Sequence, residues 1–157
     1  MNFEYIDKLI ENCNLAKKAK PIKEFALDIN DMSILDNIKN AIYIIEELNG
    51  DKQKTFENLK NYKNKKERAC PKLNEPSKIM YVGSSKTNLK KRIKEHIGDG
   101  SKSTYSLQLK HWFKGEYKIT IKIYDDISRN VLQLIEDNLS YQLKPAFGKQ
   151  GANNKNS

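Results

Sequence analysis

Cysteine and histidine are scarce in this chain, which holds two of each among 157 residues. Cys13 and Cys70 lie far apart, and neither belongs to a CxxC pair. A structural zinc site needs about four nitrogen or sulfur ligands at clustered spacings, and the sequence contains no such cluster. Two lone cysteines are typical of free thiols in a reducing compartment.

Long apolar runs are also missing. No stretch approaches the roughly 18 apolar residues of a membrane-spanning helix, and residues 1–20 include three acidic side chains. We therefore expect no signal peptide, no membrane partner and a cytoplasmic location. Hydrophobic residues make up 38% of the chain, against roughly 45–50% in an average domain when glycine is counted, so we expect a modest core.

Basic residues are in excess. The chain has 29 Lys and Arg against 20 Asp and Glu, a formal net charge of +9 and a pI near 9.4. Lysines and arginines release condensed counterions when they meet a phosphate backbone, so a nucleic-acid partner is one explanation. Solubility is the other, because net charge informs on binding and not on fold.

The N-terminal part is expected to be helical. Residues 3–19 place apolar side chains at helical spacing, Pro21 interrupts the pattern, and residues 22–27 are compatible with a short second helix. We interpret residues 1–38 as a helical N-terminal extension that packs on the domain or contacts a partner.

Three later segments have the composition of strands, namely residues 41–45, 79–83 and 118–124. Residues 49–77 are polar and rich in lysine. We interpret them as a solvated insertion between two hairpin strands, with a part that is compatible with a helix. A basic arm on DNA is a second role for this insertion.

Helices are expected at residues 88–97, 105–113 and 128–143. The order of elements predicts a small α/β domain in which helices flank a three-stranded antiparallel sheet. We place this domain at residues 39–154 and expect a loose tail at residues 155–157.

The most informative stretch begins with Tyr81-Val82-Gly83. Arg92 and His96 follow on the expected helix, four residues apart and therefore on one face. A phenol, a guanidinium and an imidazole beside the end of a strand suit the hydrolysis of a phosphodiester. Each also has an ordinary structural explanation, such as strand packing for tyrosine and a helix C-terminus for histidine.

Together with Ala41-Ile42-Tyr43, this stretch resembles the paired half-motifs of the GIY-YIG nucleases. The first half-motif has alanine in place of the usual glycine, and the second is a common variant. The two tyrosines are further apart than in the family's usual short hairpin, which implies the insertion. The resemblance covers roughly residues 40–154 and implies a GIY-YIG-like fold.

The resemblance extends to the arginine–histidine pair and to Glu136, which lies ahead of Leu143-Lys144-Pro145. It implies one divalent metal, Mg²⁺ or Mn²⁺, with Glu136 as its ligand, because Mg²⁺ prefers hard oxygen ligands and retains waters. Arg92 is expected to hold the scissile phosphate and to stabilise transition-state charge. His96 is expected either to accept a proton from water or to orient a tyrosine.

Tyr43 and Tyr81 are expected to meet the attacking water and the phosphate. A phenol with a pKa of about 10 is a poor base unless neighbouring cations lower that pKa. Lys86, Arg92 and His96 are candidates for such cations. The sequence leaves open which tyrosine or histidine activates water.

Further residues are expected to bind nucleic acid, partly because residues 100–105 are similar to a Ser/Thr-Tyr-Ser-Leu segment of restriction-type members. The candidates are Lys86, Lys91, Lys102, Tyr105 and Asn153. Many members place an asparagine soon after Leu-Lys-Pro, and Asn154 is the alternative to Asn153 for that position.

The order of these residues along the chain, namely Tyr43, Tyr81, Arg92, His96 and Glu136, predicts a metal-dependent endonuclease that hydrolyses DNA. A restriction-like, phage-related or repair role stays undecided. The alternative is a non-catalytic nucleic-acid-binding module on the same fold, and a third interpretation is an interaction protein whose N-terminal helices recruit a partner. Double-strand cleavage with one active site per chain is compatible with a homodimer.

Overall fold

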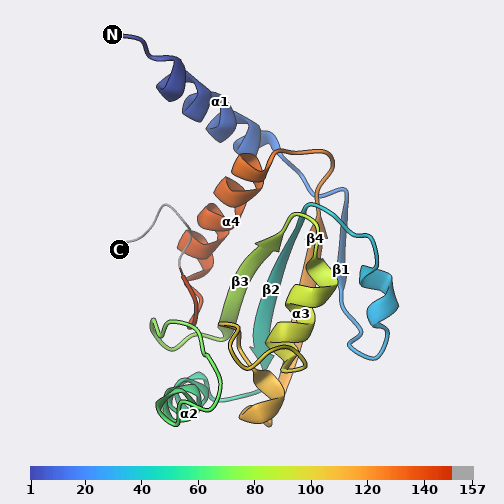
Figure 1. Cartoon of the computed structure of the whole chain (residues 1–157), viewed down its shortest axis with the longest axis vertical. Helices are drawn as coiled ribbons and strands as arrows, with labels where there is room; N and C mark the ends of the chain where they lie inside the picture. Colours follow the sequence, from blue (N-terminus) through green and yellow to red (C-terminus); the bar gives the residue numbers. More distant parts are fainter. Residues whose placement is uncertain (150–157) are drawn as a thin grey trace.

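The computed structural model describes residues 1–149, and its centre is one antiparallel sheet of four strands (Figure 1). The strands are β1 (Lys23–Ala26), β2 (Ala41–Leu48), β3 (Ile79–Ser85) and β4 (Glu116–Ile123). Their order in the sheet is β1-β4-β2-β3, so β3 is an edge strand. The prediction of an α/β domain with three later strands is confirmed, but the three-stranded sheet is wrong by one strand.

The additional strand is β1, where the sequence suggested a short helix. Its residues pair with the outer edge of β4, from Lys23 opposite Ile123 to Ala26 opposite Thr120. Phe25 is the one residue of the strand that is half-buried, and it packs against the main core. The four residues carry little local signal, so the unpaired edge of β4 determines their conformation.

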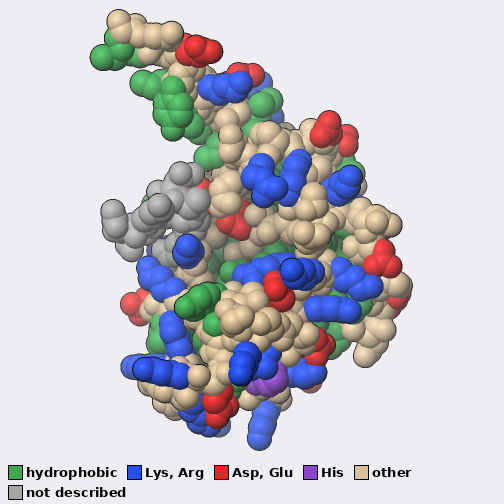
Figure 2. Space-filling model, viewed as in Figure 1, with side chains coloured by type: hydrophobic (Ala, Val, Ile, Leu, Met, Phe, Trp, Pro, Cys, Tyr) green, Lys and Arg blue, Asp and Glu red, His purple; other side chains and the backbone are tan. Residues whose placement is uncertain are grey.

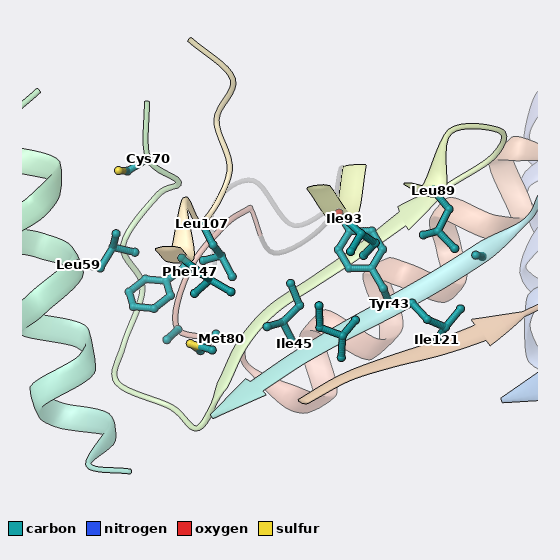
Figure 3. Packing of buried hydrophobic residues seen from close by; sticks show 14 of the residues in the cluster. Tyr43, Ile45, Leu59, Cys70, Met80, Leu89, Ile93, Leu107, Ile121 and Phe147 are labelled. Carbon is teal, nitrogen blue, oxygen red and sulfur yellow. The ribbon is translucent and has the colours of Figure 1, made fainter. Parts of the chain in front are cut away.

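The described residues form four α-helices: α1 (Glu4–Lys18), α2 (Lys52–Asn64), α3 (Leu89–Ile97) and α4 (Arg129–Leu143). The face of β2 that carries Tyr43 and Ile45 packs against α2 and α3 (Figure 3). The opposite face, with Ile42, packs against α4. The helices expected at residues 88–97 and 128–143 are therefore confirmed, and they lie on opposite faces of the sheet. None of the helices in the described part of the chain is long and apolar enough to cross a membrane.

The insertion between β2 and β3 is less solvated than its composition suggests. Leu59 and Tyr62 of α2 are buried in the main core, and the ring of Phe56 stacks on that of Phe147 at a centroid distance of 5.8 Å. After α2, the Asn74 amide donates to two backbone carbonyls of residues 145–148. The insertion therefore anchors the segment that follows α4.

The helix expected at residues 105–113 is wrong, because only Leu109–His111 forms a 3-10 turn. Gln108 has a positive φ of 54°, which ends any regular helix there. Just before it, Ser106 and Leu107 are hydrogen-bonded to α3, through the Glu95 carbonyl and the His96 ring. These tertiary bonds hold the segment in an irregular path.

Candidate active site

Tyr43 and Tyr81 come from neighbouring strands, and their rings lie nearly parallel, 5° apart, with centroids separated by 6.2 Å. Tyr43 is opposite Gly83 in the β2–β3 register. A Cβ atom at position 83 would lie 2.3 Å from both Cζ and Oη of Tyr43. Position 83 therefore needs glycine, because the ring of Tyr43 occupies the space that a Cβ atom would fill.

Gly83→Ala should lower the free energy of unfolding by about 1–3 kcal/mol, the usual cost of overpacking a dense core. The reason is that the Tyr43 ring must leave its position. Urea unfolding measures the effect, and a double-mutant cycle with Tyr43→Ala isolates it. We expect Gly83→Ala to cost less in the Tyr43→Ala background, and equal costs in both backgrounds would contradict this explanation.

His96 lies at the centre of the cluster and has no exposed surface. Its Nδ1 atom accepts the Leu107 backbone N–H at 3.1 Å, and its Nε2 atom lies 3.0 Å from Tyr43 Oη. Burial, helped by the nearby Arg92, holds the pKa of His96 well below its usual value. The ring is therefore neutral at pH 7, its proton is on Nε2, and it donates to Tyr43. This geometry favours the tyrosine-orienting role over the acceptance of a proton.

Arg92 is half-buried and is held at three points. Its Nη2 atom donates to Tyr81 Oη and to the Tyr105 carbonyl, each at 3.1 Å. Its Nη1 atom lies 3.3 Å from a Glu95 carboxylate oxygen. The guanidinium lines a surface hollow of about 360 Å³, so part of its fork faces solvent.

Glu136 reaches this cluster from α4, on the other face of the sheet, and meets it around the edge strand β3. Its carboxylate accepts from Gln133 Nε2 at 2.6 Å. Burial raises the pKa of Glu136, and hydrogen bonds from Gln133 and Ser84 only partly oppose that rise. Its charge also contributes to raising the pKa of Tyr43 and Tyr81, after the larger effect of burial.

The surroundings of Glu136 fit a divalent cation. No Lys or Arg nitrogen within residues 1–149 comes close enough to form an ion pair with its carboxylate. A buried carboxylate without a positive partner is costly, and a bound cation would remove that cost. The described residues contain no cluster of three or more His, Cys, Asp or Glu side chains. A single carboxylate agrees with Mg²⁺, which retains waters and binds substrate phosphate.

Nearby cations do not bring the pKa of the tyrosines below its usual value, although Arg92 acts in the expected direction. Burial raises the pKa of both Tyr43 and Tyr81, and the opposing effect of Arg92 is smaller. His96 is neutral, and Lys86 donates its ammonium protons to the Asn40 side chain and the Ile127 carbonyl. The phenols are therefore un-ionised at neutral pH and act here as hydrogen-bonding groups.

Of the residues expected to bind nucleic acid, two line the hollow and two lie on the loop before Ser106. Lys86 is held by the fold, although it lines the hollow together with the exposed Lys91. Lys102 is exposed, and Tyr105 has 71% of its surface exposed on the same loop. Asn153, like its alternative at position 154, lies outside the described residues.

Two residues of the site were missed in the sequence. Ser84 contacts Glu136 from the α4 face of β3, and Arg129, the first residue of α4, lines the same hollow as Arg92. Ser84 directly follows the second half-motif, so strand alternation gave a signal for it. Arg129 has no signal in its local sequence, because only the packing of α4 brings it to the hollow.

Comparison with known families agrees with this geometry. Residues 72–149 match the model of the GIY-YIG catalytic domain, a domain of nucleases that generally depend on divalent metals. The match includes Tyr81, Arg92, His96 and Glu136, and it begins after Tyr43 and α2. No curated protein and no solved structure matches the chain significantly.

Proposed function

We propose that this chain is a metal-dependent endonuclease that hydrolyses DNA phosphodiester bonds in a nuclease domain at residues 39–154. One observation carries the proposal. Four side chains from β2, β3 and α3 contact one another beside a surface hollow that Arg92 lines, and a fifth, from α4, is hydrogen-bonded to Ser84 of the edge strand β3. They are Tyr43, Tyr81, Arg92, His96 and Glu136.

Arg92 binds the scissile phosphate in this proposal. Three contacts already orient its guanidinium, so little conformational entropy is lost when a phosphate oxygen is bound. Its charge is close to the position where negative charge develops in the transition state. Arg129 lines the same hollow, and we assign it a contact with an adjacent phosphate.

Tyr43 is the residue most directly prepared for the reaction. Because His96 donates to Tyr43 Oη, the phenol proton of Tyr43 is left to point at water or phosphate. Tyr81 is committed to Arg92 through its own oxygen. We therefore assign orientation of the water to Tyr43, and placement of the arginine to Tyr81.

Glu136 is the proposed ligand of Mg²⁺ or Mn²⁺. A divalent cation bound there supplies charge neutralisation and lowers the pKa of a coordinated water. Ser84 and Gln133 hold the carboxylate in place from the same face of the sheet. Lys91, Lys102 and Tyr105 are proposed to bind DNA around the hollow, with Asn153 as a further contact from the C-terminal segment.

Incubation with supercoiled plasmid tests the proposal. We expect cleavage with Mg²⁺ or Mn²⁺ and none in EDTA. Discrete linear fragments would indicate a site-specific, restriction-like enzyme. Nicked plasmid would indicate a repair or mobile-element role, and a smear of fragments would indicate a nonspecific nuclease. Protein that binds plasmid but cuts no form of DNA or RNA with either metal would contradict it.

The second candidate is a non-catalytic nucleic-acid-binding module. The observation in its favour is Ala41, which replaces the usual glycine and is fully buried in β2. This module would bind DNA with a strong dependence on salt and without turnover. The same plasmid assay, with binding measured in parallel, separates the two candidates.

A further inference from the structure

Helix α1 has an apolar surface that the described part of the chain, residues 1–149, leaves exposed. None of its 15 residues is buried. In Figure 1 the helix projects from the body of the molecule, and Figure 2 shows hydrophobic side chains on the projecting part. Five of its large apolar residues are at least 44% exposed, namely Tyr5, Ile6, Leu9, Ile10 and Leu15, and Phe3 just before it is 54% exposed.

Only the C-terminal end of α1 is attached to the domain. Ala16 and Ala19 pack against the apolar cluster of α4. The stripe formed by Phe3, Ile6 and Leu9 lies further towards the free end. An isolated helix of this length is marginally stable in water, and a contiguous exposed apolar surface usually marks an interaction site.

The charges of α1 indicate which partner fits. The acidic residues lie in its N-terminal part, at Glu4, Asp7 and Glu11, together with one lysine, Lys8, and the last turn is basic, with Lys17 and Lys18. At 100° per residue, Asp7, Glu11 and Lys18 lie on one flank of the apolar stripe. In an antiparallel pair related by a twofold axis, like flanks meet. The acidic end of one helix then faces the basic end of the other.

We propose that α1 is a dimerisation helix that pairs antiparallel with α1 of a second copy of this chain. The contact is isologous, because each copy contributes the same stripe and the same complementary charges. A nucleic-acid partner does not fit, since the acidic flank would repel phosphates. The proposal concerns assembly alone and stands whether or not the chain cleaves DNA.

Ile6→Glu tests the apolar part of the contact. Sedimentation equilibrium should show a concentration-dependent dimer for the natural chain and a dissociation constant at least about tenfold higher for the variant. Ile29→Glu is the matched control, because Ile29 is 44% exposed outside α1, and it should leave dimerisation unchanged. A chain that is monomeric at all concentrations, or a dimer that Ile6→Glu does not weaken, would overturn the proposal.

Charge reversal tests the antiparallel arrangement. Asp7→Lys with Glu11→Lys in one chain, or Lys18→Glu in another, should each weaken self-association, by tenfold or more for the double variant. An equimolar mixture of the two variants should form a heterodimer of near-natural affinity. Failure of the mixture to associate would exclude the antiparallel arrangement.

Cys13 offers an independent readout. It is exposed on the apolar stripe, whereas Cys70, the other cysteine of the chain, is buried. A short bis-maleimide should therefore link two copies through Cys13, and Cys13→Ser should abolish the link. Cross-linking that persists equally in Ile6→Glu would show random collision and would count against the proposal.

Discussion

Glu136→Gln should abolish metal-dependent cleavage, with a loss of at least about 10³-fold, because the variant keeps the shape of the side chain but lacks the charge that binds the cation. DNA binding in EDTA should be retained, since the contacts of Arg92 and the surface lysines do not involve this carboxylate. Plasmid cleavage and filter binding measure the two effects. A variant that cuts at the natural rate would remove Glu136 from the mechanism.

The same substitution should stabilise the metal-free protein at neutral pH. Burial raises the pKa of Glu136 in the folded state above the unfolded-state pKa of about 4.5. The protonated side chain therefore contributes fully to stability below the unfolded-state pKa, and this contribution is lost as the pH rises through the folded-state pKa. Glutamine has no charge and avoids this loss. Urea unfolding in EDTA should therefore give similar stabilities near pH 4 and a more stable variant near pH 8.

Titration with Mg²⁺ tests whether Glu136 binds the cation or has only a structural role. A cation that binds only the folded state raises its stability by mass action. The natural chain should gain thermal stability with Mg²⁺, and Glu136→Gln should gain little. Equal gains in both proteins would place the cation elsewhere.

Arg92→Lys should lower the cleavage rate at saturating DNA by about 10²–10³-fold, the usual cost of removing one group that stabilises transition-state charge. Lysine keeps the positive charge, but it lacks the planar fork whose one nitrogen bonds Tyr81 and the Tyr105 carbonyl while the other contacts Glu95. The loss should appear in kcat, whereas DNA affinity should change little.

Lys94→Ala is the matched control for this prediction, since Lys94 is an exposed lysine on the same helix. It should leave kcat unchanged. Single-turnover cleavage measures the chemical step, and circular dichroism checks that both variants are folded. An Arg92→Lys variant with natural kcat would show that any cation suffices at this position.

Local sequence predicted much of the fold. The β-branched runs at residues 41–45 and 79–83 and the alternation at residues 118–124 correspond to β2, β3 and β4. The apolar periodicities at residues 88–97 and 128–143 correspond to α3 and α4. These signals are strong because each element has one buried face, and burial imposes a period of two on strands and 3.6 on helices.

The order of the site residues was equally visible in the sequence, but their burial and their protonation states were not. Nothing local indicates that His96 is fully buried and neutral, or that desolvation outweighs Arg92 at Tyr43 and Tyr81. Desolvation depends on every element packed around a group, so it is a property of the complete fold.

The sequence by itself thus determined the principal strands and helices, the family resemblance and the ordered set of polar residues, because these depend on local periodicity and spacing. Tertiary structure alone decided that β1 joins the sheet, that the segment at residues 105–113 is irregular, and that Glu136 meets the tyrosines around the edge of β3. Those features arise from pairing and burial between residues distant in the chain, where the local preference is weak.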